Sequence, residues 1–316
     1  MSEPAGSAPE ATVETAFVLG GGGVLGACEV GMLRALLEAG IVPDLVLGTS
    51  VGAINGAVFA AAPDLEGVAR LEKVWTELDA RGVFEGSLLT RLGTAVRTRT
   101  HLHSNESLRQ LLAEALDELR IEQLPLRFEC VAASIERAAE TWFAAGPAIP
   151  AVLASSAAPG LLPPVEIDGE HYLDGGLVDT VPLERAVELG ARRIYVLHVG
   201  RSEQPLTVPQ QPWEVAAVAF EISRRYRLSR ALAELPEGVT AHLLPTGNRP
   251  GDANGIASYL RYRDSGLAQE RINRAFKACA AYLEEQGTLN GEGEGQSGGE
   301  GLTGEEGRSE REVQDA

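Results

Sequence analysis

Two strand–turn–helix units follow one another in the first 62 residues, and they constrain the fold more than any other feature of the chain. The first unit joins an apolar strand at Val13–Leu19 to a helical pattern through the glycine run Gly20–Gly26. The second joins the apolar run Leu45–Leu47 to a helix over Ala53–Ala62 through the turn Gly48–Gly52. Strands separated by a helix lie parallel in one sheet, with the helices packed on its faces. The sequence therefore predicts an α/β fold with neighbouring parallel strands.

The composition divides the chain into three parts. Residues 1–12 are rich in Ala, Pro, Ser and Glu, and we expect them to be flexible. Residues 13–285 alternate apolar strands with amphipathic helices and are expected to form one domain. Residues 286–316 are rich in Gly and Glu, low in complexity and expected to be disordered. Further helices are predicted at 64–80, 106–119, 148–158, 182–189, 213–235 and 267–285, and further strands at 127–134, 141–143, 193–199 and 239–244.

The charge and cysteine content exclude several classes of protein. The net charge is −18, but residues 284–316 alone carry ten acidic and two basic side chains, so the body is only mildly acidic. No basic patch suggests a nucleic-acid partner. Cys28, Cys130 and Cys279 are too far apart for a zinc motif and argue against a disulfide framework. Neither a signal peptide nor a run of ~18 apolar residues is visible, so a cytoplasmic protein is expected.

Ser50 is the candidate nucleophile. It occupies the centre of a G-x-S-x-G sequence, Gly48 to Gly52, between a predicted strand and a predicted helix. In that setting a sharp turn exposes the serine hydroxyl, and the flanking glycines lack Cβ atoms that would clash. The alternative is that Ser50 only caps the following helix, because serine is a favoured N-cap residue.

The glycine run offers unshielded backbone N–H groups at the start of a helix, which is a site for negative charge. Gly21, Gly23 and Gly26 match the dinucleotide pattern G-x-G-x-x-G. A nucleotide site also needs an acid at the end of the second strand, where this chain has the elbow around Ser50 instead. The other candidate charge is the oxyanion of an ester under attack by a serine, and this interpretation is favoured.

The base that activates Ser50 is less evident from the sequence. Asp174 followed by His198 or His242 gives the chain order of an α/β-hydrolase triad. The elbow comes too early in the chain for that fold, however, and His198 lies in an apolar run typical of a core or strand-end histidine. Asp174 precedes two glycines and could present its carboxylate into a cleft, although a lone Asp-Gly-Gly is more often a surface turn.

Taken together, these blocks resemble the patatin-like phospholipase family over about residues 13–200. Gly21 to Gly26 is similar to its oxyanion loop and Gly48 to Gly52 to its nucleophile elbow. The segment from Ser156 to Pro164 is similar to the one preceding its catalytic acid. Asp174 with Gly175 and Gly176 is similar to its D-G-G block.

The resemblance implies a three-layer α/β/α sandwich around a mostly parallel sheet, with 13–285 as a patatin-like catalytic domain. It implies a serine acyl hydrolase that cleaves lipid carboxylic esters by a Ser50–Asp174 dyad, without metal, nucleotide or other cofactor. Gly21, Gly22 and Gly23 would donate N–H groups to the oxyanion. The expected supporting glycines are Gly26, Gly48, Gly52, Gly175 and Gly176.

One position departs from the family pattern. Leu25 stands where the family usually has Arg or Lys, just before the last glycine of the loop. A patatin-fold lipid-binding or regulatory protein with little turnover is therefore the alternative. The expected partner is a lipid or lipid-like ester at a membrane or micelle surface, and the candidate segments for transient contact with that surface are residues 81–104 and the 213–235 helix. For that helix, ordinary core packing is favoured over membrane contact.

Overall fold

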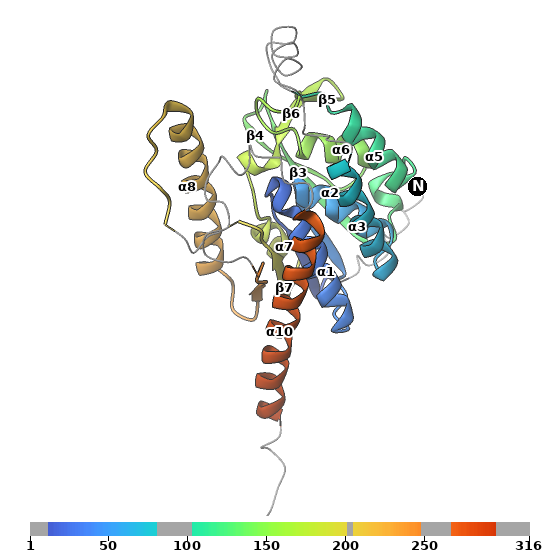
Figure 1. Cartoon of the computed structure of the whole chain (residues 1–316), viewed down its shortest axis with the longest axis vertical. Helices are drawn as coiled ribbons and strands as arrows, with labels where there is room; N and C mark the ends of the chain where they lie inside the picture. The colour runs from blue at the N-terminus through green and yellow to red at the C-terminus, as the bar shows by residue number, and fades with distance from the viewer. Residues whose placement is uncertain (1–11, 81–102, 201–204, 248–266, 295–316) are drawn as a thin grey trace, which may run out of the picture.

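The computed structural model describes residues 12–80, 103–200, 205–247 and 267–294 (Figure 1). Its strands are β1 (Thr15–Leu19), β2 (Leu45–Thr49), β3 (Arg127–Ser134), β4 (Ala139–Phe143), β5 (Val165–Ile167), β6 (Glu170–Asp174), β7 (Arg193–Leu197) and β8 (Thr240–Leu243). Its α-helices are α1 (Ala27–Glu38), α2 (Val51–Ala61), α3 (Leu65–Ala80), α5 (Glu106–Leu116), α6 (Ala148–Ser155), α7 (Leu183–Glu188), α8 (Pro212–Ala233) and α10 (Ala268–Glu294). Short 3₁₀ turns are η1 (Gly23–Gly26), η2 (Ile121–Gln123) and η3 (Gly175–Leu177).

The strands of the described residues form one sheet in the order β5-β6-β3-β2-β1-β7-β8, with β4 paired to β3. Five neighbouring strands, β3, β2, β1, β7 and β8, run parallel and end at the sheet edge formed by β8. The remaining strands add antiparallel pairs at the β3 side. The predicted α/β fold with a mostly parallel sheet is confirmed.

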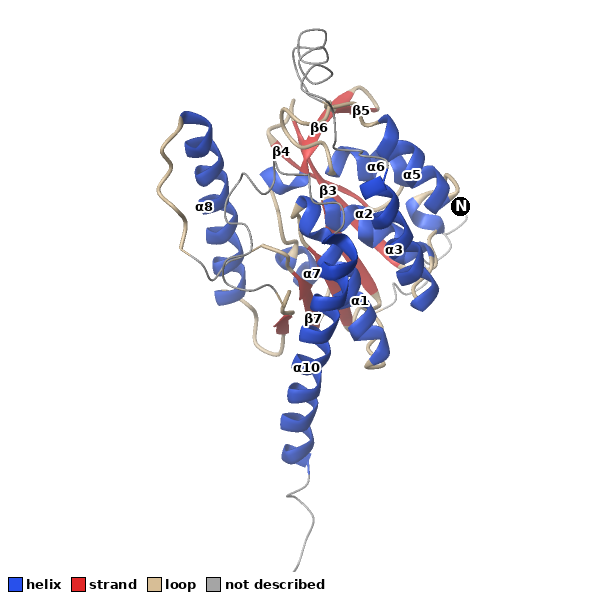
Figure 2. Cartoon of the chain, in the orientation of Figure 1, coloured by secondary structure: helices blue, strands red, loops and turns tan. Residues whose placement is uncertain are grey.

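Helices cover both faces of this sheet, as Figure 2 shows. Alternate residues of β1 point to opposite sides: Phe17 and Leu19 join a core with α1, α2, α3, α5, α6 and α10. Ala16 and Val18 join a smaller core with α7 and α8. Successive side chains of a strand point to opposite faces of the sheet, and here both faces are buried. A central parallel strand therefore appears in the sequence as a continuous apolar run.

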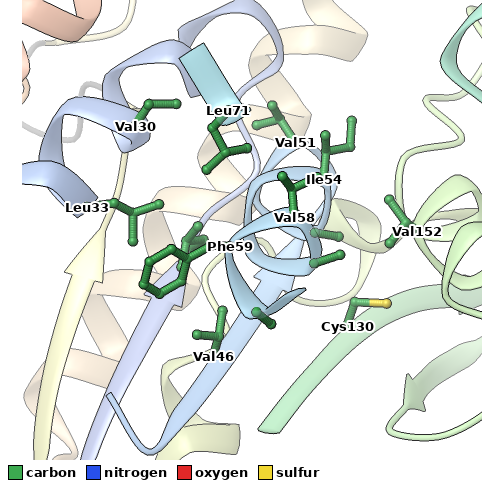
Figure 3. Close-up of a cluster of buried hydrophobic side chains, with 14 of the residues drawn as sticks. Val30, Leu33, Val46, Val51, Ile54, Val58, Phe59, Leu71, Cys130 and Val152 are labelled. Carbon is green, nitrogen blue, oxygen red and sulfur yellow. The ribbon is translucent and has the colours of Figure 1, made fainter. Parts of the chain in front are cut away.

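The larger core is centred on α2, whose residues from Val51 to Ala60 are all buried. Phe59 lies between α2 and the strands (Figure 3), with its ring stacked on that of Phe17 at a centroid distance of 6.3 Å. Tyr195 meets the Phe17 ring edge-on, at a centroid distance of 5.8 Å. Truncating such a ring costs about 3–5 kcal/mol, so these aromatics fix the position of α2 and of the turn that precedes it.

Strand register brings three distant segments to one edge of the sheet. Leu19 at the end of β1 pairs with Gly48, and Thr49 at the end of β2 pairs with Val131. The next residue of β3, Ala132, pairs with Asp174 at the end of antiparallel β6. The glycine run, Ser50 and Asp174 therefore leave the sheet at the same place.

Some predictions for the helices differ from the structure. The helix predicted over 148–158 ends at Ser155. Helix α10 continues to Glu294, past the predicted end at 285, although glycines in its last turns disfavour helix. Val215 and Ile222 on α8 are 52% and 54% exposed, so the expected core packing is wrong for them.

Several predicted segments lie partly or wholly outside the described residues, namely 1–11, 81–102, 248–264 and 295–316. Within the described part of the chain, no helix has the length and apolarity needed to cross a membrane.

Candidate active site

Ser50 lies in a strained turn between β2 and α2. Its φ of 56° and ψ of −120° fall in a region that L-residues rarely adopt. The turn is possible because glycines flank it: a Cβ on Gly52 would lie 2.2 Å from the Leu19 carbonyl oxygen, and one on Gly48 would lie 2.5 Å from the Gly52 oxygen. The Ser50 side chain makes no capping bond to α2, which argues against the helix-cap interpretation. Strain of this kind, about 1–3 kcal/mol per residue, is typical of functional sites.

The hydroxyl of Ser50 is bonded to Asp174. Ser50 Oγ donates to Asp174 Oδ2 at 2.6 Å, while Asp174 Oδ1 accepts from the Gly176 N–H at 2.8 Å. Gly175 lets the chain turn here, since a Cβ on it would lie 2.2 Å from the Val131 carbonyl oxygen. Asp174 is thus held by its neighbours with one oxygen directed at the serine.

Burial changes the chemistry of Asp174. The residue is 9% exposed. Burial raises the pKa of its carboxyl from 3.8 to about 6, although the hydrogen bonds from Ser50 and Gly176 and the charge of Arg224 act in the opposite direction. A carboxylate with this pKa is a stronger base than an exposed aspartate and is still ionised at neutral pH.

Neither histidine predicted as an alternative base is bonded to Ser50 in the described part of the chain. His198 is buried just after β7, and burial, together with the charges of Arg224 and Arg225, lowers its pKa to about 3. His242 stacks on Tyr195 at a centroid distance of 5.0 Å. The expectation that His198 is a strand-end core residue is confirmed.

The glycine run lies against Ser50, but its N–H groups are not all available as the sequence predicts. The Gly20 N–H donates to the Leu197 carbonyl at 3.1 Å and the Gly21 N–H to the Thr180 carbonyl at 2.9 Å. This second bond occupies the Gly21 N–H, which corrects its predicted role as an oxyanion donor. Within the described residues no protein group accepts from the N–H of Gly22 or Gly23, so these two donors remain.

An apolar pocket opens beside Ser50. Ser50 and Gly23 lie on its wall with mainly apolar side chains from α2, α3, α5 and the segment after α6. The lining residues are Gly23, Ser50, Val51, Ile54, Trp75, His103, Leu108, Ser156, Ala158, Leu161 and Leu162. Such a pocket suits an acyl chain, because it removes apolar surface from water.

The comparison with known proteins decides the family. The model of the patatin-like phospholipase family matches residues 17–187, which include the glycine run, Ser50 and Asp174. The chain belongs to the patatin-like phospholipase family. The boundaries of this match agree with the resemblance carried by the glycine loop, the elbow and the D-G-G block.

Several curated proteins are similar to this patatin-like domain. A patatin-like phospholipase domain-containing protein of Caenorhabditis elegans, ZK370.4, is 36% identical over 60% of this chain and 14% of its own length. Lysophospholipase nte1 of Aspergillus terreus is 32% identical over 58% of this chain and 12% of its own. An uncharacterised NTE family protein of Mycobacterium bovis, Mb1092c, is 28% identical over 70% of this chain and 58% of its own. The chain therefore matches about one seventh or less of the first two relatives and over half of the third.

Among solved structures, VipD from Legionella pneumophila has a TM-score of 0.40 and 14% identity over 86% of this chain and 67% of its own.

The patatin-like site contains supporting residues that the sequence motifs did not indicate. Ser155 Oγ accepts from the Ser50 N–H at 2.9 Å, and Ser156 Oγ donates to the Ser50 carbonyl at 3.1 Å. Ser156 belongs to a segment that carried the resemblance, whereas nothing in the sequence distinguishes Ser155. Together these two serines at the end of α6 hold both backbone polar groups of Ser50.

Asn55 provides a second buried support, on the far side of the glycine loop. Its Nδ2 donates to the Gly26 carbonyl at 3.0 Å and to Glu29 Oε2 at 2.7 Å, and its Oδ1 accepts from Trp75 Nε1 at 3.0 Å. Burial raises the pKa of Glu29 well above its usual range. The network joins the loop to α1, α2 and α3 through fully buried groups.

No cluster of three potential metal ligands from His, Cys, Asp or Glu occurs among the residues that the structure describes.

Proposed function

We propose that this chain is a serine acyl hydrolase that cleaves carboxylic esters of lipids by a Ser50–Asp174 dyad. The observation that carries the proposal is the 2.6 Å hydrogen bond from Ser50 Oγ to Asp174 Oδ2 in a strained elbow. Membership of the patatin-like phospholipase family supports the reaction class. The apolar pocket beside Ser50 supports a substrate with an apolar acyl group.

In the first half of the reaction, Ser50 Oγ attacks the ester carbonyl carbon as its proton passes to Asp174 Oδ2. The carbonyl oxygen becomes an oxyanion, for which the N–H groups of Gly22 and Gly23 are the available donors. Collapse of this intermediate breaks the ester C–O bond, and the leaving alcohol takes the proton from Asp174. An acyl chain remains bonded to Ser50.

In the second half, Asp174 removes a proton from water as the water oxygen attacks the acyl-enzyme. Collapse of the second oxyanion releases a carboxylic acid and returns the proton to Ser50. One carboxylate thus acts as the base in each half, and the Gly176 N–H keeps it oriented.

Ester turnover by matched variants tests this proposal. Wild type, Ser50→Ala and Ser155→Ala are compared on esters of increasing acyl-chain length and on phospholipid and lysophospholipid vesicles or micelles. We expect Ser50→Ala to lose at least about 10³-fold in kcat and Ser155→Ala, which retains the nucleophile, to lose much less. Lipid binding by a folded wild type with no turnover beyond Ser50→Ala would instead support a lipid-binding or regulatory protein.

A further inference from the structure

Arg224 of α8 approaches the glycine loop from a part of the chain outside the family match. The residue is 7% exposed, and its Nη2 donates to the Gly21 carbonyl oxygen at 3.0 Å. The opposite nitrogen, Nη1, donates to Glu221 Oε2 at 2.9 Å, one turn earlier on the helix. A buried guanidinium paired in this way is held in position, since its planar donors fix both partners at once.

The bond to Gly21 acts on the proposed oxyanion donor through one peptide unit. The Gly21 carbonyl and the Gly22 N–H belong to the same planar peptide, in which they point in opposite directions. Gly21 also lies against the nucleophile, because a Cβ added to it would lie 3.5 Å from Ser50 Cβ. Holding the carbonyl on the Arg224 side therefore directs the Gly22 N–H away from Arg224.

Two other bonds fix the two peptides that precede this one, Gly20–Gly21 and Leu19–Gly20. The Gly21 N–H is bound to Thr180 at 2.9 Å and the Gly20 N–H to Leu197 at 3.1 Å. These bonds orient the backbone up to Gly21 but leave rotation of the next peptide open. The Arg224 bond restrains that rotation.

The loop itself carries no cation. Leu25 occupies the position where the family usually has Arg or Lys, and it packs its side chain against the larger core. Arg224 supplies a positive charge beside the same loop from α8, and this charge also acts on Asp174.

We propose that Arg224 is a positioning residue of the hydrolase, which holds the Gly21–Gly22 peptide with the Gly22 N–H available to the oxyanion and supplies the charge missing at position 25. This inference rests on the proposed function. Because a misplacement of about 1 Å in a catalytic group can cost 10²-fold, loss of Arg224 should lower kcat by about 10². The apolar pocket is untouched by the change, so KM should stay within about threefold.

The test compares Arg224→Met and Arg224→Ala with Arg225→Met. Arg225 is the matched control because it is adjacent, is also paired with Glu221 at 2.9 Å, and is not the donor to Gly21. Each variant is first checked for folding by its thermal transition. Ester kcat and KM and the rate of Ser50 labelling by a fluorophosphonate are then measured, with and without added guanidinium at millimolar concentration.

The expected result is a loss of about 10² in kcat and in labelling rate for both Arg224 variants, wild-type behaviour for Arg225→Met, and partial recovery of Arg224→Ala by guanidinium. An Arg224→Met protein as active as Arg225→Met would overturn the inference and leave the proposed function intact. So would a folded Arg224→Ala that loses activity with no recovery by guanidinium. A wild type that is neither active nor labelled would overturn both.

Discussion

Replacing Asp174 by Asn should abolish turnover and at the same time stabilise the fold at neutral pH. The folded-state pKa of Asp174 is about 6, against 3.8 in the unfolded chain. The folded protein therefore binds this proton more tightly than the unfolded one. The favourable contribution of Asp174 is complete below pH 3.8 and is lost as the pH rises through about 6.

The size of the effect follows from the shift. A difference of about two pKa units at 1.36 kcal/mol each makes the ionised carboxylate about 3 kcal/mol less favourable in the folded protein than the neutral form. Asn is neutral at every pH and can still accept the Gly176 N–H bond. We expect Asp174→Asn to be up to about 3 kcal/mol more stable than wild type at pH 7.5, with the difference shrinking to below about 1 kcal/mol near pH 4.

Urea unfolding at pH 7.5 and pH 4 measures this difference. Asp168→Asn is the matched control, because Asp168 lies in the β5–β6 turn with a φ of 53° that Asn also tolerates. The same pKa predicts that kcat/KM of wild type is half-maximal near pH 6 and falls tenfold per pH unit below it. An Asp174→Asn variant no more stable than wild type at pH 7.5, or a flat wild-type rate from pH 5 to 7, would refute this reasoning.

Three further predictions follow from close contacts. Gly52→Ala should prevent folding of the elbow, because its Cβ would lie 2.2 Å from the Leu19 carbonyl oxygen. Thermal unfolding of the expressed variant checks this and should show no cooperative transition. Ile54→Trp should fill the pocket and lower kcat/KM for long-chain more than for short-chain esters, which a chain-length series measures; an equal loss would contradict the pocket assignment. Asn55→Asp should lower the free energy of unfolding by about 2–4 kcal/mol, because it places a second carboxyl group against buried Glu29. Urea unfolding measures this loss of stability, which should be smaller at low pH, where both carboxyl groups are neutral.

The central part of the fold is predictable because its signals are local. Apolar runs at β1 and β2, each ending in glycines before a helix, fix parallel pairing and the strand edge at which Ser50 lies. The hydrogen-bond partner of Ser50 cannot be predicted from a local signal, because Asp174 lies 124 residues away in the sequence. Its approach depends on antiparallel β6 pairing with β3 at Ala132, which no local pattern indicates. Only the combined motif resemblance placed Asp174 there.

Which N–H groups of the glycine loop are bonded within the protein could not be deduced from the sequence. Every glycine in the run carries a similar N–H group, and the distinction between Gly21 and Gly22 comes from Thr180 on another segment. The contact of Arg224 with the loop could not be predicted for the same reason. Arg224 is one of several arginines on α8, and only packing places it against Gly21. Charged side chains on a helix usually lie in solvent, so no periodic pattern in the sequence marks a buried arginine.

Covalent labelling of the nucleophile tests the central claim most directly. The folded protein is incubated with a fluorophosphonate at pH 7.5, digested, and the modified peptide is sequenced by mass spectrometry. The Ser50–Asp174 dyad predicts a single adduct on Ser50, absent in Ser50→Ala and strongly slowed in Asp174→Asn, with Ser155 and Ser156 unmodified. A folded wild type without an adduct, or with one on another serine, would contradict the assignment.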